Sequence, residues 1–211
     1  MIAVLDYGIG NLRSAEKALQ HVGADARLVD SPGDAMDASG IVLPGVGAFG
    51  ACARALRDSG LDEVVRLCIS DGRPFLGICV GLQLLFESSE EDPDVPGLGI
   101  LQGSVRATAA SERRPQMQWN LVRQVAGKSS RLLGEAGSRW YYFVHSYAPA
   151  PEGVEALQSV VGTCDYGGEL AVAFERGNMF GTQFHPEKSA SAGLQLLERF
   201  ARICTEESPD R

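Results

Sequence analysis

The chain has 211 residues, of which 45% are hydrophobic and 22% are charged. This composition supports a sizeable core and excludes disordered, collagen-like and coiled-coil proteins. The 27 acidic residues outnumber the 19 basic ones, and the net charge of −8 comes without a basic run, which argues against nucleic-acid binding. Every apolar run is far shorter than the roughly 20 residues that span a bilayer, so we expect no membrane segment.

The chain begins with an apolar run that lacks both a basic region and a small-residue cleavage site, so it is predicted to be a buried strand and not a leader. The cysteines are odd in number and show no C-x-x-C spacing, which argues against a disulfide framework and against a zinc site. We therefore expect a cytoplasmic protein that holds neither a metal nor another cofactor. The cysteines are Cys52, Cys68, Cys79, Cys164 and Cys204.

Over about the first 90 residues, short apolar runs rich in β-formers alternate with stretches of helical periodicity. That alternation predicts βαβ units and a parallel sheet. The expected strands are 2–6, 25–29, 40–43 and 74–78. The expected helices are 11–22, 49–57, 61–70 and one after Cys79 that includes Leu82, Leu84, Leu85 and Phe86.

The pattern changes after an acidic, Pro/Gly-rich stretch at 88–99, which is predicted to be a surface loop. From 99 to 184 the hydrophobic period is mostly two, and a hairpin turn at 176–178 implies an antiparallel portion. The expected strands are 105–107, 120–125, 140–147, 158–163, 170–175 and 179–184. A closing helix is expected at 190–204.

Residues 77–81, Gly-Ile-Cys-Val-Gly, have the form of a G-x-S-x-G nucleophile elbow with Cys79 in place of serine. The segment lies between a predicted strand and a predicted helix, as such an elbow requires. The glycines permit a tight turn, and the helix N-terminus favours the thiolate. We interpret Cys79 as a nucleophile, against the alternative of a buried small hydrophobe. The other four cysteines are assigned to the core.

A thiol nucleophile needs a base and a group that orients the base. His185 follows a predicted strand and precedes Pro186, and Glu187 would share its face in extended geometry. Cys79, His185 and Glu187 are therefore a candidate triad. His145 is the competing base, but its mid-strand position assigns it to the pocket wall, and His21 is expected to be solvated.

Two glycine-containing segments have further interpretations. Residues 44–47, Pro-Gly-Val-Gly, follow a predicted strand, and their amides, together with that of Val80, are candidate donors to an oxyanion. A plain turn is the alternative. Residues 6–13 contain a G-x-G, but Arg13 stands where a dinucleotide fingerprint needs its third glycine, so nucleotide binding is only a weak alternative.

Taken together, these motifs resemble the class I, triad-type glutamine amidotransferases. The elbow and His-Pro-Glu at 185–187 mark the wider class. Residues 6–14, 142–147 and 188–189 are similar to those of the glutaminase subunits of imidazole glycerol phosphate synthase. The resemblance covers nearly the whole chain. It implies a three-layer, flavodoxin-like α/β fold with a mostly parallel central sheet and an antiparallel C-terminal portion, in a single domain at 1–204 with a short polar tail at 205–211.

The resemblance also implies hydrolysis of glutamine through a glutamyl thioester, and transfer of ammonia through a tunnel to a cyclase subunit, a (β/α)₈ barrel, in histidine biosynthesis. Cys79 would be the nucleophile, His185 the proton shuttle and Glu187 its orienting group. Amides of Val46 and Val80 would form the oxyanion hole. Gly47, Gln83 and Ser146 would bind glutamine, while the cyclase interface would include Asn11, Trp119, Tyr142 and Lys188.

One segment departs from the family's usual Pro-His-Met-Gly-Trp-Asn. Here Gln116 replaces the histidine and Gln118 replaces the glycine. Gln118 adds a long side chain and disfavours positive φ. If the glycine is needed for a close backbone approach, docking or signalling to the cyclase is affected.

Two alternatives are kept open. The first is the same triad in another synthase or in an independent cysteine hydrolase. The second is a non-catalytic flavodoxin-like binding domain.

Overall fold

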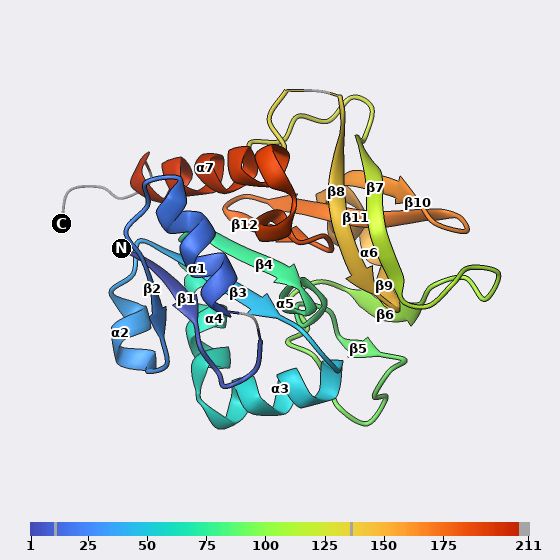
Figure 1. The fold of residues 1–211 in the computed structure, drawn as a ribbon. Helices are drawn as coiled ribbons and strands as arrows, with labels where there is room; N and C mark the ends of the chain where they lie inside the picture. Colours follow the sequence, from blue (N-terminus) through green and yellow to red (C-terminus); the bar gives the residue numbers. More distant parts are fainter. Residues whose placement is uncertain (11, 136, 207–211) are drawn as a thin grey trace.

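In a computed structural model, residues 1–10, 12–135 and 137–206 are described, and they form a layered α/β fold (Figure 1). Within this part of the chain the central sheet has nine strands in the order β2-β1-β3-β4-β12-β11-β10-β7-β8. The first five of these run parallel, and each pair from β12 to β8 runs antiparallel. The predicted fold class is thereby confirmed. A second sheet has the order β5-β6-β9.

The N-terminal half follows the predicted alternation closely, because the apolar runs at 2–5, 40–45 and 75–79 are buried on both faces of a parallel sheet. An additional short helix, α2, begins after Ser31, whose hydroxyl accepts a hydrogen bond from the Asp34 amide, with Pro32 in the first turn. The elements are β1 (Ile2–Leu5), α1 (Leu12–His21), β2 (Ala26–Val29), α2 (Pro32–Met36), β3 (Gly40–Gly45), α3 (Phe49–Asp58), α4 (Leu61–Ser70) and β4 (Phe75–Cys79).

The helix expected to run from the elbow through Phe86 is shorter than predicted. The observed helix, α5 (Val80–Gln83), gives way to tighter turns, because the amides of Leu85 and Phe86 donate to carbonyls only three residues back. Leu84 O, Leu85 O and Phe86 O accept from backbone amides of residues 98–101 instead of continuing a helical ladder. The short strand β5 (Ser88–Ser89) then lies inside the predicted 88–99 loop.

The C-terminal half differs more from the predictions. The expected strand at 140–147 is in fact two strands in different sheets, β8 and β9, with Ser146 between them. The start of the expected strand at 158–163 is helical, in α6. The elements are β6 (Gly103–Ala107), β7 (Gln116–Gln124), β8 (Ser138–His145), β9 (Tyr147–Pro151), α6 (Gly153–Ser159), β10 (Val160–Asp165), β11 (Glu169–Arg176), β12 (Met179–Thr182), η1 (Pro186–Lys188) and α7 (Ala190–Glu206).

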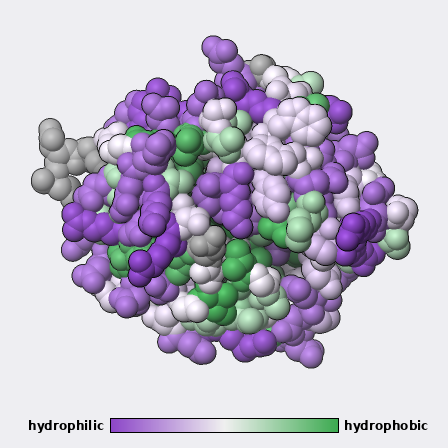
Figure 2. Space-filling view, in the orientation of Figure 1, coloured by the Kyte–Doolittle hydropathy of each residue, from purple (hydrophilic) through white to green (hydrophobic). Residues whose placement is uncertain are grey.

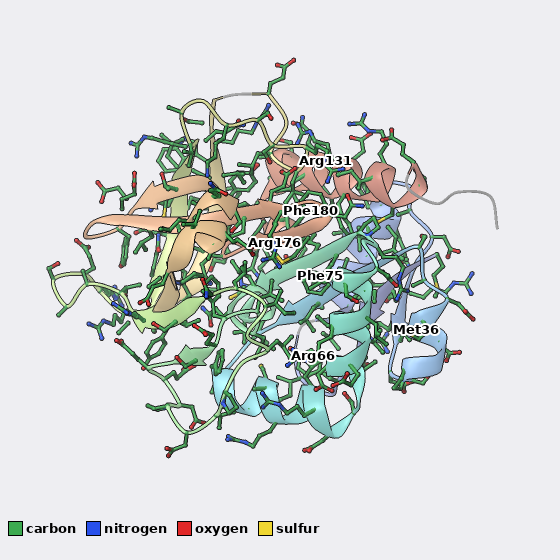
Figure 3. The ribbon with its side chains drawn as sticks, turned by 180° about the vertical axis from the view of Figure 1, so that it is seen from behind. Met36, Arg66, Phe75, Arg131, Arg176 and Phe180 are labelled. Carbon is green, nitrogen blue, oxygen red and sulfur yellow. The ribbon has the colours of Figure 1, made fainter. Side chains whose placement is uncertain are left out.

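Helices cover the parallel part of the sheet on both faces, with α1 and α7 packed together on one side and α3 and α4 on the other (Figure 1). The hydrophobic core is one connected cluster that reaches from Ile2 to Cys204. Seen from behind, Arg131 lies over the ring of Phe180 on β12, with its guanidinium carbon 5.2 Å from the ring centroid (Figure 3). The predicted hairpin turn joins β11 to β12 in the register Arg176–Met179.

All five cysteines are buried thiols, and no disulfide joins any two of them. Within the described ranges, no helix is both long and apolar enough to cross a membrane.

Candidate active site

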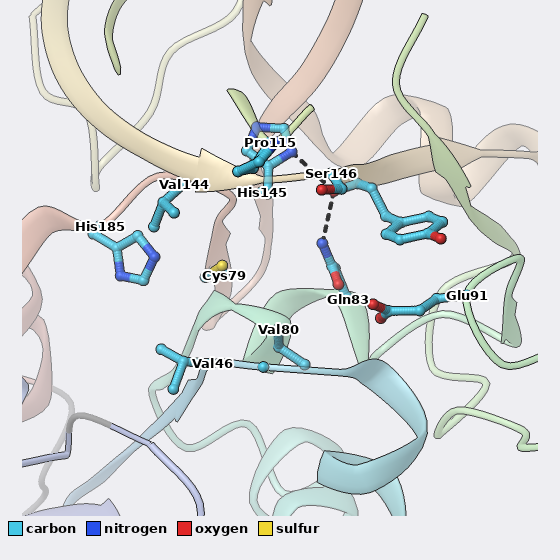
Figure 4. Close-up of a pocket in the computed structure, with 12 residues that line it drawn as sticks. Val46, Cys79, Val80, Gln83, Glu91, Pro115, Val144, His145, Ser146 and His185 are labelled. Atoms are coloured by element: carbon cyan, nitrogen blue, oxygen red, sulfur yellow. Dashed lines mark hydrogen bonds between the residues drawn. The ribbon is translucent and has the colours of Figure 1, made fainter. Parts of the chain in front are cut away.

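A cavity of about 240 Å³ opens where β3, β4 and the segment after β12 end (Figure 4). These strands are parallel, so their carboxyl ends meet at one edge of the sheet, the usual position of a site in an α/β fold. The cavity is lined by Val46, Gly47, Cys79, Val80, Gln83, Glu91, Pro115, Val144, His145, Ser146, Tyr147 and His185.

Cys79 forms the predicted elbow at the junction of β4 and α5. Its φ of 56° is strained for a residue with a side chain, and such a conformation costs about 1–3 kcal/mol. The flanking glycines make the turn possible. A Cβ on Gly81 would lie 1.8 Å from Leu43 O, and one on Gly77 would lie 2.9 Å from the Gly81 backbone. The close backbone approach thus requires both glycines and exposes the thiol to the cavity.

His185 and Glu187 form a buried ion pair, with 2.7 Å between His185 Nδ1 and Glu187 Oε1. The pairing was predicted, but from extended geometry. In the structure Pro186 starts a 3₁₀ turn that brings the carboxylate back to the ring. Burial lowers the pKa of His185, but the neighbouring Cys79 and Glu187 outweigh burial and raise it to about 10. The other side of the ring lies beside Cys79 (Figure 4). This arrangement favours the protonated, imidazolium form of His185 beside the Cys79 sulfur.

The backbone of His185 is hydrogen-bonded to β8, directly and through Ser189. Its amide donates to Tyr142 O at 3.0 Å. The buried hydroxyl of Ser189 donates to His185 O at 2.6 Å and accepts from the Tyr142 amide at 2.9 Å. These three bonds fix the histidine relative to the strand that carries the opposite wall of the cavity.

His145 lies in that wall, as predicted, and its environment differs from that of His185. Its Nδ1 donates to Tyr147 O at 2.9 Å, which leaves Nε2 as the unprotonated nitrogen of a neutral ring. Burial, together with the nearby charge of His185, lowers the pKa of His145 to about 4. The ring is therefore neutral at physiological pH, and it lacks a carboxylate partner among the described residues.

The candidate oxyanion donors lie on the side of the cavity nearest β3. Val46 follows the end of β3, and Val80 is the first residue of α5, so the Val80 amide has no acceptor within that helix. Both residues flank Cys79 in Figure 4. Gly47 has a φ of +90°, a conformation that favours glycine. The predicted residues are thus brought together around the thiol.

Two buried glutamines, Gln83 and Gln183, are hydrogen-bonded to each other beside Cys79. Gln83 Nε2 donates to Gln183 Oε1 and to Tyr147 O, both at 2.9 Å, and Gln183 Nε2 lies 3.5 Å from the Cys79 sulfur. Ser146, in the break between β8 and β9, also lines the cavity.

Glu91, which was not predicted, contributes a carboxylate to the wall and accepts from the Phe49 amide at 2.7 Å. It lies in the acidic segment that was predicted only as a surface loop. No local motif distinguishes it from the neighbouring acidic residues.

Three of the four residues expected at a partner interface lie outside the cavity, and the fourth, Asn11, is outside the described residues. Trp119 on β7 is 44% exposed and contacts Tyr142 on β8 edge to face, with 6.2 Å between ring centroids. Lys188 is exposed. Large pale side chains cover β7 and β8 in the space-filling view, beside hydrophilic purple ones (Figure 2).

The two departures from the family pattern take different positions on β7. Gln116 is fully buried, whereas Gln118 is exposed and pairs with Phe143 in the regular register of β7 and β8. Among the described non-glycine residues only Cys79 and Ala190 have positive φ, so Gln118 carries no such strain. The structure describes no group of three or more His, Cys, Asp or Glu side chains that could hold a metal ion.

Comparison with known proteins identifies the family of this chain. Residues 3–204 match the family model for glutamine amidotransferase class-I. The imidazole glycerol phosphate synthase subunit HisH of Moorella thermoacetica is 45% identical over 202 residues, which cover 96% of this chain and 94% of that protein. The chloroplastic imidazole glycerol phosphate synthase hisHF of Arabidopsis thaliana is 44% identical over 95% of this chain, but only 34% of that longer protein is covered.

Solved structures show the same fold at lower sequence similarity. A crystal structure of a glutamine amidotransferase superposes with a TM-score of 0.73 at 22% identity, covering 97% of this chain and 98% of that one.

Proposed function

Because the chain belongs to the class I glutamine amidotransferases and, within them, to the HisH subunits of imidazole glycerol phosphate synthase, we propose that it hydrolyses glutamine with Cys79, His185 and Glu187 and passes ammonia to a cyclase subunit. The observation that carries this proposal is the strained Cys79 beside a histidine whose other nitrogen is paired with a carboxylate.

The reaction begins with attack of the Cys79 thiolate on the side-chain amide carbon of glutamine. The carbonyl electrons move to oxygen, and the amides of Val46 and Val80 stabilise the oxyanion. The His185 imidazolium gives its proton to the departing nitrogen, the C–N bond breaks, and ammonia leaves a glutamyl thioester on Cys79. Glu187 keeps the imidazole in the tautomer and orientation that this transfer needs.

Neutral His185 then takes a proton from water, and the resulting hydroxide attacks the thioester. The C–S bond breaks, glutamate is released, and the thiolate and imidazolium are restored. Gly47, Gln83 and Ser146 hold the substrate in this scheme. Glu91 joins them, since its carboxylate is a suitable partner for the α-ammonium group of glutamine.

Support for a docking surface comes from the exposed apolar side chains on β7 and β8. Met117 is 62% exposed and Trp140 is 57% exposed, and both belong to the same two strands as Trp119 and Tyr142. Exposed aromatic side chains of this kind are typical anchors of protein interfaces. The partner assigned to this face is the cyclase barrel, with Lys188 at its edge. A cytoplasmic location and a single domain at 1–204 stay predictions.

Glutamate release tests the proposal, measured with the chain alone, with the cyclase subunit, and with the cyclase and its ribonucleotide substrate. Strong stimulation in the last case supports the synthase. Steady activity that ignores the cyclase would instead favour an independent hydrolase with the same triad.

The docking surface is tested by Trp119→Ala, which should weaken cyclase binding about 10-fold. Leu67→Ala is the control, since Leu67 is also exposed, at 48%, but lies on α4. Equal cyclase binding by the two variants would contradict the assignment of this face.

A further inference from the structure

Val46 lies between β3 and α3, and two side chains bond to backbone carbonyls on either side of the Val46 amide. Tyr7 Oη donates to Pro44 O at 2.7 Å. Cys52 Sγ, on α3, donates to Val46 O at 3.3 Å. Both side chains are buried, with Tyr7 at 5% and Cys52 at 0% exposure.

The two bonds fix the peptide planes on either side of the one that carries the Val46 N–H. Pro44 O belongs to the plane before Gly45, and Val46 O belongs to the plane that leads to Gly47. With both neighbours held, the location of the intervening peptide, and so its distance from Cys79, is restricted.

Close packing around Gly45 also joins this segment to the nucleophile elbow. A Cβ on Gly45 would lie 2.7 Å from the Gly81 amide nitrogen and 3.1 Å from Tyr7 Oη. Gly45 is also the register partner of Cys79 in the pairing of β3 with β4. Tyr7, this segment and the elbow therefore pack directly on one another, so a shift of the segment changes its distance from the reacting atoms.

We propose that Tyr7 and Cys52 are positioning residues for the reaction, holding the Val46 amide where it stabilises the oxyanion. This inference rests on the proposed function and adds two residues to it. Neither side chain touches the substrate in this assignment, since neither lines the cavity.

Both groups keep the protons that this role needs. Burial raises the pKa of the Cys52 thiol, and burial together with the nearby Cys79 and Glu91 outweighs the hydrogen bonds with Tyr7 and Val46, which lower it. Burial also raises the pKa of Tyr7 well above its usual range, and the nearby Cys52 adds to that shift. Cys52 is thus a thiol donor and not a second nucleophile.

The test compares kcat and KM for glutamine in Cys52→Ala, Cys52→Ser and Tyr7→Phe, assayed with the cyclase subunit present. We expect kcat to fall about 10-fold or more in Cys52→Ala and in Tyr7→Phe with little change in KM, since misplacement of a catalytic group is costly. Cys52→Ser keeps a donor and should retain most of the activity. Tyr7→Phe removes a single oxygen and so serves even if Cys52→Ala folds poorly.

Matched controls separate positioning from general loss of packing. Cys68 on α4 is another fully buried thiol, and it bonds the carbonyls of Arg73 and Pro74 at the opposite end of the strands, so Cys68→Ala should leave kcat unchanged. Tyr141 is buried with no hydroxyl partner among the described residues, so Tyr141→Phe should also leave kcat unchanged.

A second readout is the rate at which iodoacetamide alkylates Cys79. Attack on a saturated carbon forms no oxyanion, so this rate should be the same in the wild-type protein and in all the variants. Wild-type kcat in both Cys52→Ala and Tyr7→Phe would overturn the inference while leaving the proposed function intact. Parallel losses of kcat and alkylation would also overturn it, by showing damage to the nucleophile. A wild-type protein that does not hydrolyse glutamine would contradict the proposed function as well.

Discussion

The segment after β12 and the end of β8 each bring a buried histidine to the same cavity, but the pKa values of the two histidines are shifted in opposite directions. His185 lies beside Cys79 and pairs with the carboxylate of Glu187, and these two neighbours raise its pKa to about 10. His145 meets the carbonyl oxygen of Tyr147, and its pKa is lowered to about 4. Burial lowers the pKa of both rings, so the difference comes from their partners. A buried histidine acts as a proton donor only where a negative charge supports it.

The largest expected effect falls on the β12 side of this comparison. His185→Asn, which retains a donor near the Nδ1 position, should lower kcat for glutamine hydrolysis by about 10³-fold or more, because it removes the group assigned to protonate the leaving ammonia. Cys79→Ala should lower kcat at least as much, and the double variant should lower kcat no more than the more severe single variant does. Steady-state assays on folded variants check this. Additive losses would identify another base, with His145 the first candidate.

The partner of His185 is the next target. Glu187→Gln keeps the size of the side chain but removes its charge, so the pKa of His185 should fall and kcat should drop about 100-fold. An NMR titration of His185 beside the kinetic assay measures both. An unchanged pKa would show that Cys79, and not Glu187, sustains the protonated ring.

A much smaller effect is expected on the β8 side. His145→Asn preserves a donor toward Tyr147 O and should change kcat by less than about 10-fold, because a neutral ring bonded to a carbonyl takes no part in proton transfer. Parallel assays of His145→Asn and His185→Asn check the ranking. A loss in His145→Asn as large as that in His185→Asn would remove the distinction between the two histidines.

The smallest effect is on the pH dependence of stability. The pKa of His145 is lower in the folded than in the unfolded state. Its contribution to the free energy of unfolding is therefore present above about pH 6.5 and is lost as the pH falls toward 4. The pKa of His185 is raised in the folded state. Its contribution to the free energy of unfolding is therefore present below about pH 6.5 and is lost as the pH rises through about 10. Denaturant unfolding at a series of pH values measures the free energy of unfolding. His145→Asn should weaken its pH dependence only on the acid side, and His185→Asn only on the alkaline side. Equal changes on both sides would contradict the assignment.

The sequence alone predicts the triad because its parts depend on local pattern. The glycines around Cys79 are needed for one tight turn, and Glu187 is only two residues from His185. The βαβ half is predictable for a similar reason, since strands buried on both faces produce continuous apolar runs.

Features set by distant segments were not predictable in this way. Carbonyls of residues 84–86 accept from amides of 98–101, so the chain after α5 pairs with a distant segment. The break at Ser146 depends on pairing of β9 with β6 in another sheet. Glu91 reaches the cavity by bonding the Phe49 amide, 42 residues away in the chain.

The central claim is that Cys79 carries the glutamyl group. Its most direct test is peptide mapping by mass spectrometry after rapid acid quenching of the protein with its cyclase subunit and glutamine. The account predicts a glutamyl adduct on the peptide that contains Cys79, and its absence in Cys79→Ala. Glutamine hydrolysis with the adduct on another cysteine, or with equal turnover in Cys79→Ala, would contradict it.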